Sequence, residues 1–313
     1  MRIDAQPNPA QLGRVAVLCG GYSAEREISL ASGEACLAAL QARGVVAEAF
    51  DPAARSISEM KDFDRALIAL HGPGGEDGSI QGALETLAVP YTGSGVLGSA
   101  LAMDKLQSKR IWQAMGLPTP AFRVLHGPED IEPTLTALSL PLFVKPLNEG
   151  SSLGTSRVER SQDLLAAFET ARGFGQTVLV ERCIEGPEYT LGLLNGEALA
   201  AIRIEVSANF YDFEAKYRSD ATRMLIPSGL SASQEKALTV LSQQAFTGIG
   251  ATGWGRVDVM ADAAGQFWLL EVNTVPGMTD HSLVPEAARA HGIDQEELVW
   301  RILLTSWRHG EIH

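Results

Sequence analysis

The chain has 313 residues, of which 45% are hydrophobic and 20% charged, a composition typical of globular proteins and far from that of disordered ones. Its length exceeds what one hydrophobic core usually organises, so two or three domains are expected. The net charge of −13 argues against nucleic acid or an anionic membrane as the main partner.

Neither the cysteines nor the N-terminus indicates secretion. Cys19, Cys36 and Cys183 are dispersed and odd in number, which fits a reducing cytoplasm better than a disulfide framework. The first residues contain no apolar stretch of signal-peptide length, and no later run approaches a membrane span. We therefore expect a cytoplasmic protein that does not contact a membrane.

Strands and helices alternate over the first third of the chain, and this alternation predicts a parallel α/β sheet. Glycine-rich segments follow two of the strands, at 20–21 and at 71–78, and ligands bind at that carboxyl edge of a parallel sheet. From apolar runs and periodicity we expect strands at 15–19, 45–50, 66–70 and 89–92 and a helix from about 25 to 43 that ends at Gly44.

The remaining two thirds read as mixed helix and strand, and we expect three domains, at 1–93, 94–180 and 181–313. The expected helices are 104–115, 162–172, 231–249 and one or two at the C-terminus, and the expected strands are 142–145, 155–158, 178–181, 189–193, 200–205, 256–260 and 267–272.

The segment 255–273 gives the most informative chemical pattern. It predicts two strands joined as a hairpin, so that Glu271 and Asn273 share one face, as do Arg256 and Asp258. With the turn centred between the strands, Arg256 lies opposite Glu271, and Asp258 lies diagonally from Glu271 within about 7–8 Å. Two carboxylates and an amide oxygen between apolar neighbours are hard oxygen ligands that suit Mg²⁺.

A plainer interpretation of this hairpin is a solvated pair of strands in which Arg256 forms an ion pair with Glu271, since ion pairs also occur in sheets. The metal-site interpretation is favoured because the opposite faces of both strands are apolar and look fully buried.

Lys145 lies in an apolar strand and precedes a loop rich in glycine and serine, 148–154. A lysine at the end of a buried strand needs an anionic partner. The N–H groups and hydroxyls of such a loop can surround phosphate. The loop is not a GxxxxGK[ST] P-loop, because no lysine follows Gly154, and many such loops merely turn a corner. Lys105 by itself reads as a surface lysine on a helix.

Several blocks, taken together, resemble the D-alanine–D-alanine ligases of the ATP-grasp superfamily. They follow one another in the family's order from residue 20 to residue 285, so the resemblance covers nearly the whole chain. The blocks are Gly20-Gly-Tyr-Ser-Ala-Glu25, Leu70-His-Gly-Pro-Gly-Gly-Glu-Asp-Gly78, Glu149-Gly-Ser-Ser-Leu-Gly154, Tyr211-Asp-Phe-Glu-Ala-Lys216-Tyr217, Gly255-Arg-Val-Asp258, Leu270-Glu-Val-Asn-Thr-Val-Pro-Gly-Met-Thr279 and His281-Ser-Leu-Val-Pro285.

The resemblance implies an α/β (α+β) ATP-grasp fold in three domains, with an N-terminal parallel sheet and ATP held between the central and C-terminal domains. It implies that Lys105 and Lys145 contact the ATP phosphates, and that Arg256 steadies charge on the transferred phosphoryl group. The implied nucleotide set is Lys105, Lys145, Glu181, Ile184 and Glu188, and the implied ligands of two Mg²⁺ or Mn²⁺ ions are Asp258, Glu271 and Asn273.

The same resemblance implies where two D-alanine molecules bind. Glu25 would hold the ammonium group of the first, within a network that includes Ser151 and Tyr217, and His71 would lie beside it. Gly277 would offer its N–H to an oxyanion. The residues implied to receive the carboxylate of the second D-alanine are Lys216, Ser282 and Leu283.

This assignment implies the synthesis of D-alanyl-D-alanine through an acyl phosphate, for peptidoglycan precursors, by an enzyme expected to be a homodimer like its relatives. The acyl phosphate hydrolyses in water, so loops at 148–154 and near 207–220 are expected to close over it. The sequence departs from the family's pattern at Val275, Asp280 and Arg182.

Two alternatives to this reading stay open. One is another ATP-grasp ligase or a depsipeptide-forming relative, although Tyr217 after Lys216 resembles the dipeptide-forming enzymes. The other is a non-catalytic nucleotide-binding module, against which the metal ligands and Arg256 argue, since sensing ATP needs no in-line phosphoryl site.

Overall fold

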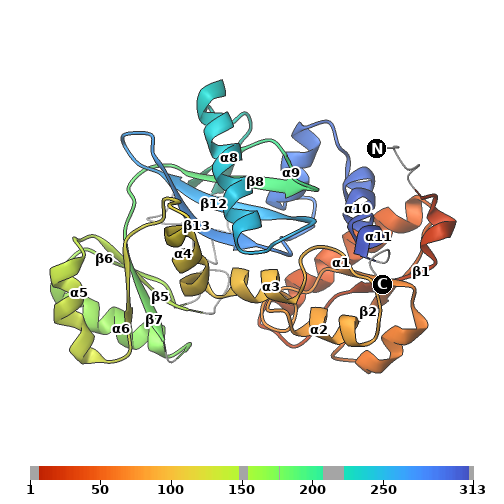
Figure 1. Ribbon diagram of the computed structural model, residues 1–313, viewed down its shortest axis with the longest axis horizontal. Coiled ribbons are helices and arrows are strands. Elements are labelled where there is room, and N and C mark those ends of the chain that lie inside the picture. The colour runs from red at the N-terminus through yellow and green to blue at the C-terminus, as the bar shows by residue number, and fades with distance from the viewer. Residues whose placement is uncertain (1–6, 148–153, 176, 207–221, 310–313) are drawn as a thin grey trace.

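The computed structural model of the protein describes residues 7–147, 154–175, 177–206 and 222–309 (Figure 1). The described strands form three sheets, one from each third of the chain. In Figure 1 the C-terminal sheet lies between the middle sheet at one end of the molecule and the N-terminal sheet at the other. No helix in the described ranges has the length and apolar character needed to cross a membrane.

The N-terminal sheet has the strand order β2-β1-β3, and its strands are parallel, as predicted. The prediction of a strand at 89–92 is wrong, because this segment joins β3 through an isolated bridge from Tyr91 to Ala66. Pro90 has no N–H with which to extend the ladder. The elements are η1 (Pro9–Leu12), β1 (Arg14–Leu18), α1 (Arg26–Ala42), β2 (Val46–Phe50), η2 (Ile57–Asp62), β3 (Arg65–Ile68) and α2 (Ser79–Thr86).

Helix α1 is fixed against the carboxyl edge of this sheet. Its Ser29 hydroxyl donates to the Ala69 carbonyl at 2.7 Å and accepts from the Gly20 N–H at 2.9 Å. Gly44 follows the helix with φ of +78°, which confirms the predicted glycine stop. The start of α1, with Glu25 as its N-cap residue, is therefore held beside the ends of β1 and β3.

The middle sheet is antiparallel, with the order β4-β7-β5-β6. Burial alternates along β5, so that Leu142 and Val144 face one core and Lys145 projects to the other side. β4 was not predicted, because its sequence, Phe122-Arg-Val-Leu125, is short and interrupted by a charge. The elements are β4 (Phe122–Leu125), η3 (Pro128–Asp130), α5 (Ile131–Ala137), β5 (Leu142–Pro146), β6 (Ser156–Val158), η4 (Ser161–Asp163), α6 (Leu164–Arg172) and β7 (Val178–Arg182).

The C-terminal sheet has the order β11-β10-β8-β12-β13, with β9 paired to β8. β8 and β12 are buried along most of their length because α8 packs on them and apolar residues occupy both strands. β9 and β11 were not predicted. The elements are β8 (Glu188–Leu194), β9 (Glu197–Ala198), β10 (Ile202–Val206), β11 (Thr222–Leu225), α8 (Ala232–Gly248), β12 (Trp254–Ala261) and β13 (Phe267–Asn273).

In the described ranges, five further helices connect these sheets. α4 begins at an Asp104 cap, whose carboxylate accepts the Gln107 N–H at 3.0 Å. α10 packs against α1, so the C-terminal end of the chain returns to the N-terminal sheet. These helices are α3 (Val96–Met103), α4 (Lys105–Ala114), α9 (Leu283–Ala290), α10 (Gln295–Leu303) and α11 (Thr305–His309).

We propose a three-domain division that follows the sheets. A boundary at 180/181, as expected from the sequence, would cut β7, whose residues pair with both β4 and β5. The proposed boundary therefore lies after Arg182, before β8 starts the next sheet.

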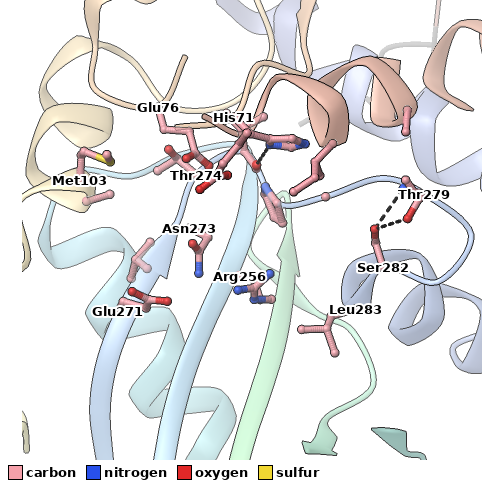
Figure 2. A pocket seen from close by; sticks show the side chains of 18 of the residues that line it. His71, Glu76, Met103, Arg256, Glu271, Asn273, Thr274, Thr279, Ser282 and Leu283 are labelled. Carbon is pink, nitrogen blue, oxygen red and sulfur yellow. Dashed lines mark hydrogen bonds between the residues drawn. The ribbon is translucent and has the colours of Figure 1, made fainter. Parts of the chain in front are cut away.

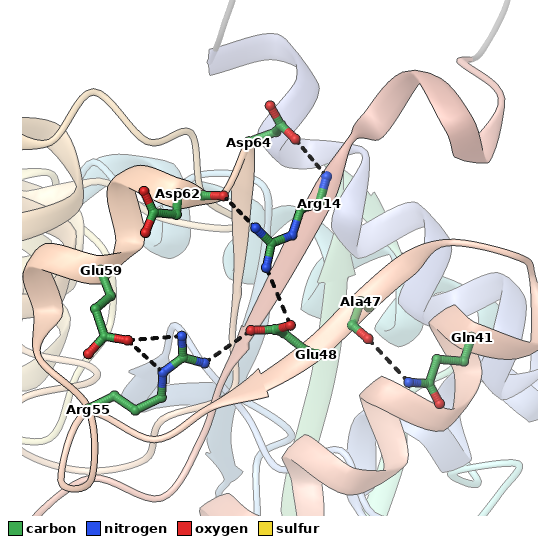
Figure 3. Close-up of polar contacts among 8 residues, drawn as sticks. All are labelled: Arg14, Gln41, Ala47, Glu48, Arg55, Glu59, Asp62 and Asp64. Carbon is green, nitrogen blue, oxygen red and sulfur yellow. Dashed lines mark hydrogen bonds and ion pairs between the residues drawn. The ribbon is translucent and has the colours of Figure 1, made fainter.

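A polar network fastens the outer strand β2 to the segment that leads into β3 (Figure 3). The Arg55 guanidinium lies 3.1 Å from carboxylate oxygens of both Glu48 and Glu59 and stacks over the Phe50 ring. Arg14 reaches the other oxygen of Glu48 at 3.5 Å, and its backbone N–H donates to Asp64 at 2.6 Å. Such exposed pairs stabilise the fold by about 0–1 kcal/mol each, so the network orders a surface and does not build the site.

Candidate active site

A cavity of about 420 Å³ lies where the carboxyl edge of the N-terminal sheet meets the C-terminal sheet (Figure 2). Its wall comes from the loops after β1 and β3, the α3–α4 junction, the ends of β12 and β13, and segment 274–283. The predicted site residues that line it are Glu25, His71, Lys105, Arg256, Glu271, Asn273, Gly277, Ser282 and Leu283.

The hairpin of β12 and β13 carries polar side chains into this cavity, but its register differs from the prediction. Arg256 pairs with Asn273, and Asp258 lies directly opposite Glu271. The predicted pairing of Arg256 with Glu271 is wrong for two reasons. The turn is wider by one residue, and the register shifts between Asp258 and Val259, which leaves Leu270 as an extra residue in β13.

Asp258 is buried, and its carboxylate oxygens accept hydrogen bonds from three side chains. Arg256 donates to both of its carboxylate oxygens, from Nε and Nη2, at 2.8 Å each. The Thr190 hydroxyl donates at 2.5 Å and the Asn273 amide N–H at 3.0 Å. Arg256 therefore forms its ion pair with Asp258 in the same strand, and the pairing with Glu271 that we considered as an alternative is wrong.

Glu271 instead lies near the start of α4. Its carboxylate is 3.4 Å from the Lys105 ammonium, and the Lys105 side chain is 11% exposed. The interpretation of Lys105 as an ordinary surface lysine is therefore wrong. The N-terminal end of α4 brings it beside Arg256 and Asn273 in one cavity, which gives the wall both cationic and anionic groups.

Lys145 meets a carboxylate of its own sheet. Its ammonium lies 2.6 Å from Glu181 Oε2, and the other oxygen of Glu181 lies 2.7 Å from the Lys109 ammonium. Burial raises the pKa of Glu181, but the two lysines outweigh it, so that the pKa is lowered and the carboxylate stays charged. Sequence reasoning missed Lys109, because a lysine on a helix reads as exposed.

His71 joins the N-terminal loops to segment 274–283. Its Nδ1 lies 2.9 Å from the Val275 carbonyl, and its Nε2 lies 2.9 Å from the Ser32 hydroxyl. Burial lowers the pKa of His71 to about 4, so the ring is neutral near pH 7. A proton on Nδ1 satisfies both contacts, because Nδ1 then donates to the carbonyl and Nε2 accepts from Ser32. The Met278 N–H donates to the same serine oxygen at 3.1 Å.

Two carboxylates from different loops face the cavity on its N-terminal side, Glu25 and Glu76. Glu76 accepts the Gly72 N–H at 2.8 Å. The pKa of Glu76 is raised to about 8. Burial is the largest cause, and the negative charge of neighbouring Glu25 is the second. Sequence reasoning missed Glu76, although it stands in the glycine-rich segment 71–78, and its position after a strand was the available signal.

The segment that follows β13 is shaped around Ser282, the N-cap residue of α9. The Thr279 N–H donates to its hydroxyl at 3.0 Å. A side chain at Gly277 would place its Cβ 2.9 Å from Ser282 Oγ, so glycine is needed for this close approach. Gly277 and Ser282 therefore lie side by side in the cavity wall.

The three positions that depart from the family's pattern are accommodated. Val275 is buried and uses its backbone carbonyl to hold His71. Arg182 lies over the Trp268 ring at 5.0 Å, and Asp280 is exposed.

The structure does not bring every predicted residue into the cavity. Ser151, Lys216 and Tyr217 lie outside the described residues. Lys145 and Glu181 lie on β5 and β7, Ile184 is buried in the β7–β8 connection, and Glu188 begins β8. Asp258 lies behind Arg256 and does not line the cavity.

Of the three predicted metal ligands, Glu271 and Asn273 line the cavity, whereas Asp258 is held by Arg256. Among the residues that the structure describes, no three His, Cys, Asp or Glu side chains are grouped as metal ligands. The predicted set instead combines two carboxylates, of Asp258 and Glu271, with the amide oxygen of Asn273. Such hard oxygen donors suit Mg²⁺ or Mn²⁺, which keep positions for phosphate oxygens and water.

Comparisons with known proteins identify the family. The family model described as the D-ala D-ala ligase C-terminus matches residues 111–304, and the one described as its N-terminus matches residues 44–94. A D-alanine–D-alanine ligase of Alkalilimnicola ehrlichii is 57% identical over 96% of both chains. One of Stutzerimonas stutzeri is 53% identical over 99% of both.

Solved structures show the same fold. The D-alanine–D-alanine ligase of Bacillus anthracis complexed with ATP aligns with a TM-score of 0.84 and 32% identity, over 96% of this chain and 99% of that one. The VanG D-Ala:D-Ser ligase of Enterococcus faecalis aligns with a TM-score of 0.83 and 26% identity, over 94% and 99%. The α/β ATP-grasp fold is thereby confirmed. The chain belongs to the D-alanine–D-alanine ligase family, ATP-dependent enzymes that join two D-alanine molecules for peptidoglycan precursor synthesis.

Proposed function

We propose that this protein joins two D-alanine molecules within the described cavity, through an acyl phosphate formed with ATP and two Mg²⁺ or Mn²⁺ ions. The observation that carries the proposal is that cations and carboxylates from β12, β13 and α4 line one cavity together with His71 and Gly277. The ATP complex of the Bacillus anthracis relative supports the choice of nucleotide.

The nucleotide occupies the side of the cavity nearest the middle sheet in this proposal. Lys105 and Lys145 bind its phosphates, as cations whose present partners are the carboxylates of Glu271 and Glu181. Glu181, Ile184 and Glu188 contact the base and the ribose. Asp258, Glu271 and Asn273 hold the metal ions, which, when bound, neutralise charge on the transferred phosphoryl group.

Arg256 has two tasks in the proposed reaction. It now neutralises Asp258, and from the same position its guanidinium faces the cavity, where it steadies the phosphoryl group. With a metal ion bound, Asp258 would hold it through the carboxylate oxygens that Arg256 now contacts, and Arg256 would turn to the phosphoryl group. Arginine binds phosphate in its planar fork as well as it binds carboxylate, so this exchange keeps its donors satisfied.

The first D-alanine lies against the N-terminal wall. Glu25 binds its ammonium group, and neutral His71 lies beside it without adding a competing positive charge. One carboxylate oxygen attacks the γ-phosphorus of ATP, ADP leaves, and an acyl phosphate forms. Ser151 and Tyr217 complete the Glu25 network in this proposal.

The second D-alanine lies against segment 274–283, with its carboxylate received by Ser282, Leu283 and Lys216. Its amine attacks the carbonyl carbon of the acyl phosphate and loses a proton, and inorganic phosphate leaves. The Gly277 N–H donates to the oxyanion formed in between. We further propose that the enzyme works in the cytoplasm as a homodimer.

A phosphate-release assay tests the proposal. With ATP and Mg²⁺, phosphate is expected to appear when D-alanine is added and to match the dipeptide formed mole for mole. L-alanine and D-lactate are expected to give little release. No phosphate release with any of these compounds would instead support the non-catalytic nucleotide-binding module, and release that is greatest with D-alanine and D-lactate together would support the depsipeptide-forming enzyme.

A further inference from the structure

Lys109 is a fully buried lysine to which the proposed reaction assigns no role. It lies one helical turn after Lys105 on α4, and its side chain is 0% exposed. Lysine is almost never buried in this way unless it is paired. It cannot touch a ligand in the cavity, so any role in the site must act through its neighbours.

Its neighbours tie three elements together. The Lys109 ammonium donates to the Thr119 hydroxyl at 2.6 Å, and that hydroxyl donates to the Leu269 carbonyl of β13 at 2.9 Å. The ammonium also lies 2.7 Å from Glu181 Oε1 on β7. In Figure 1, α4 lies between the middle sheet and the C-terminal sheet, so Lys109 is anchored to both.

Glu181 is shared between two lysines that differ in exposure. Lys109 is fully enclosed, whereas the Lys145 side chain is 15% exposed and contacts Glu181 Oε2 at 2.6 Å. Glu181 itself is 3% exposed. Without Lys109, Lys145 would be the one cation left at ion-pair distance from Glu181 among the residues that the structure describes. Moving Lys145 to a phosphate would then leave a buried carboxylate without a countercharge, which is strongly unfavourable.

Stability alone does not account for this arrangement. A buried ion pair contributes little compared with well-packed apolar residues, because both charges lose their hydration. Burial lowers the pKa of Lys109 to about 8, although Glu181 opposes the shift, which shows the strain of enclosing this charge. Lys109 is costly to bury and shares Glu181 with Lys145 of the proposed nucleotide site. A role in that site therefore explains its burial better than stability does.

We propose that Lys109 is a positioning residue of the nucleotide site, which holds Glu181 permanently and so leaves Lys145 able to turn from that carboxylate to a phosphate oxygen of ATP. This inference rests on the proposed role of Lys145 in binding ATP. Lys105, on the same face of α4, meets Glu271 of the C-terminal sheet in the same way that Lys109 meets Glu181 of the middle sheet.

The test is a double-mutant cycle between positions 109 and 181, read out as the dissociation constant for ATP with Mg²⁺. Lys109→Met removes the buried charge and keeps the side chain's length, so Glu181 retains Lys145 and ATP affinity falls by about tenfold or more. Glu181→Gln removes the competing carboxylate. The double variant is expected to match Glu181→Gln within about twofold, because Lys109 acts only through Glu181.

Controls separate this role from a general loss of structure. Lys236→Met, at an exposed site on α8, is expected to leave ATP affinity unchanged. The KM for D-alanine, measured at saturating ATP, is expected to change less than about twofold in Lys109→Met, since the D-alanine side of the cavity does not contact Lys109. Should Lys109→Met fail to fold, the charge-matched double variant and Glu181→Gln give the deciding comparison.

Two results would overturn the inference. One is an unchanged ATP affinity in folded Lys109→Met, and the other is a double variant that binds ATP about tenfold more weakly than Glu181→Gln. Failure of the proposed function looks different, because then the wild-type protein would bind no ATP or would release no phosphate with D-alanine.

Discussion

Glu271 is the residue on which the metal dependence of the proposed reaction rests. It faces the cavity opposite Asp258 and near Lys105. Glu271→Gln keeps the shape of the side chain but removes its charge, so metal binding weakens while the fold survives. We expect kcat to fall by about 10²–10³-fold, typical for loss of a group that stabilises developing charge. Steady-state phosphate release at saturating Mg²⁺, with circular dichroism for the fold, measures this.

The matched control is Glu132→Gln, an exposed carboxylate on α5, which is expected to keep its wild-type rate. Full activity of Glu271→Gln in buffer that contains a chelator would exclude Glu271 as a metal ligand.

His71 gives a prediction about stability and pH. Its pKa is about 4 in the folded protein, below the ordinary value of 6.5. The unfolded chain therefore takes up this proton first as the pH falls, and stability is lost between about pH 6.5 and pH 4. From pH 7 to pH 5 this one group is expected to lower the free energy of unfolding by roughly 2 kcal/mol.

Urea unfolding at the two pH values, for wild type, His71→Gln and the exposed-site control His126→Gln, checks this. The loss is expected to shrink in His71→Gln and to persist in His126→Gln. Equal pH dependence in all three proteins would show that His71 is not held neutral by the fold.

At the scale of elements, Gly255 allows β12 to approach its neighbours closely. A Cβ there would lie 2.6 Å from the Phe246 ring of α8 and 2.7 Å from the Asn273 carbonyl of β13. Gly255→Ala is therefore expected to lower the free energy of unfolding by about 1–3 kcal/mol, through overpacking. It is also expected to reduce activity, because the overpacking would displace Arg256, the next residue, which lines the cavity.

Gly82→Ala is the matched control for denaturant unfolding of Gly255→Ala. Its Cβ would meet Val96 at an ordinary 3.7 Å, and alanine favours the helix, so its stability is expected to be equal or higher. A Gly255→Ala protein as stable as wild type would show that β12 and α8 can separate without penalty.

Elements with a strong apolar period were predictable, and those that depend on partners were not. The sequence predicted β1, β2, β3, α1 and both strands of the β12–β13 hairpin within a few residues. It did not reveal the bulge at Leu270, because a single extra residue leaves the apolar alternation of each half intact. That bulge places Asp258 opposite Glu271 and leaves Arg256 paired with Asp258.

Charged residues that the fold turns inward were the second feature that could not be predicted from the sequence. Lys109 and Glu76 look like surface residues in the sequence. The packing of α4 against two sheets buries Lys109, and the loop after β3 turns Glu76 into the cavity. The resemblance located several other cavity residues because each stands in one of its blocks, and these are Glu25, His71, Arg256, Glu271, Asn273, Gly277, Ser282 and Leu283. The roles given to those residues remain proposals.

At the scale of the whole molecule, the cavity joins parts of the chain that are far apart in sequence. His71 bonds to Val275, and Ser32 bonds to Met278, so the N-terminal loops and the segment after β13 form one wall. The N-terminal sheet and the C-terminal sheet are thus coupled at the site. Ligands that bind between them are expected to stabilise the entire fold.

Thermal unfolding tests whether the folded protein binds the nucleotide through Lys145. ATP with Mg²⁺ at about 100 times its dissociation constant is expected to add about 2.7 kcal/mol to the free energy of unfolding. Lys145→Ala is expected to lose most of this gain at the same ATP concentration, whereas the exposed-site control Lys61→Ala is expected to keep it. An undiminished gain in Lys145→Ala would remove that lysine from the nucleotide site.

The central claim, that the cavity activates the carboxylate of D-alanine as an acyl phosphate, is tested most directly with oxygen isotopes. D-alanine carrying ¹⁸O in both carboxylate oxygens is incubated with the protein, ATP and Mg²⁺, and the phosphate is analysed by mass spectrometry. In the proposed reaction the attacking carboxylate oxygen stays on phosphorus when the second amine displaces phosphate. We expect one ¹⁸O in each phosphate released, together with ADP and labelled dipeptide. Phosphate free of ¹⁸O would contradict the account.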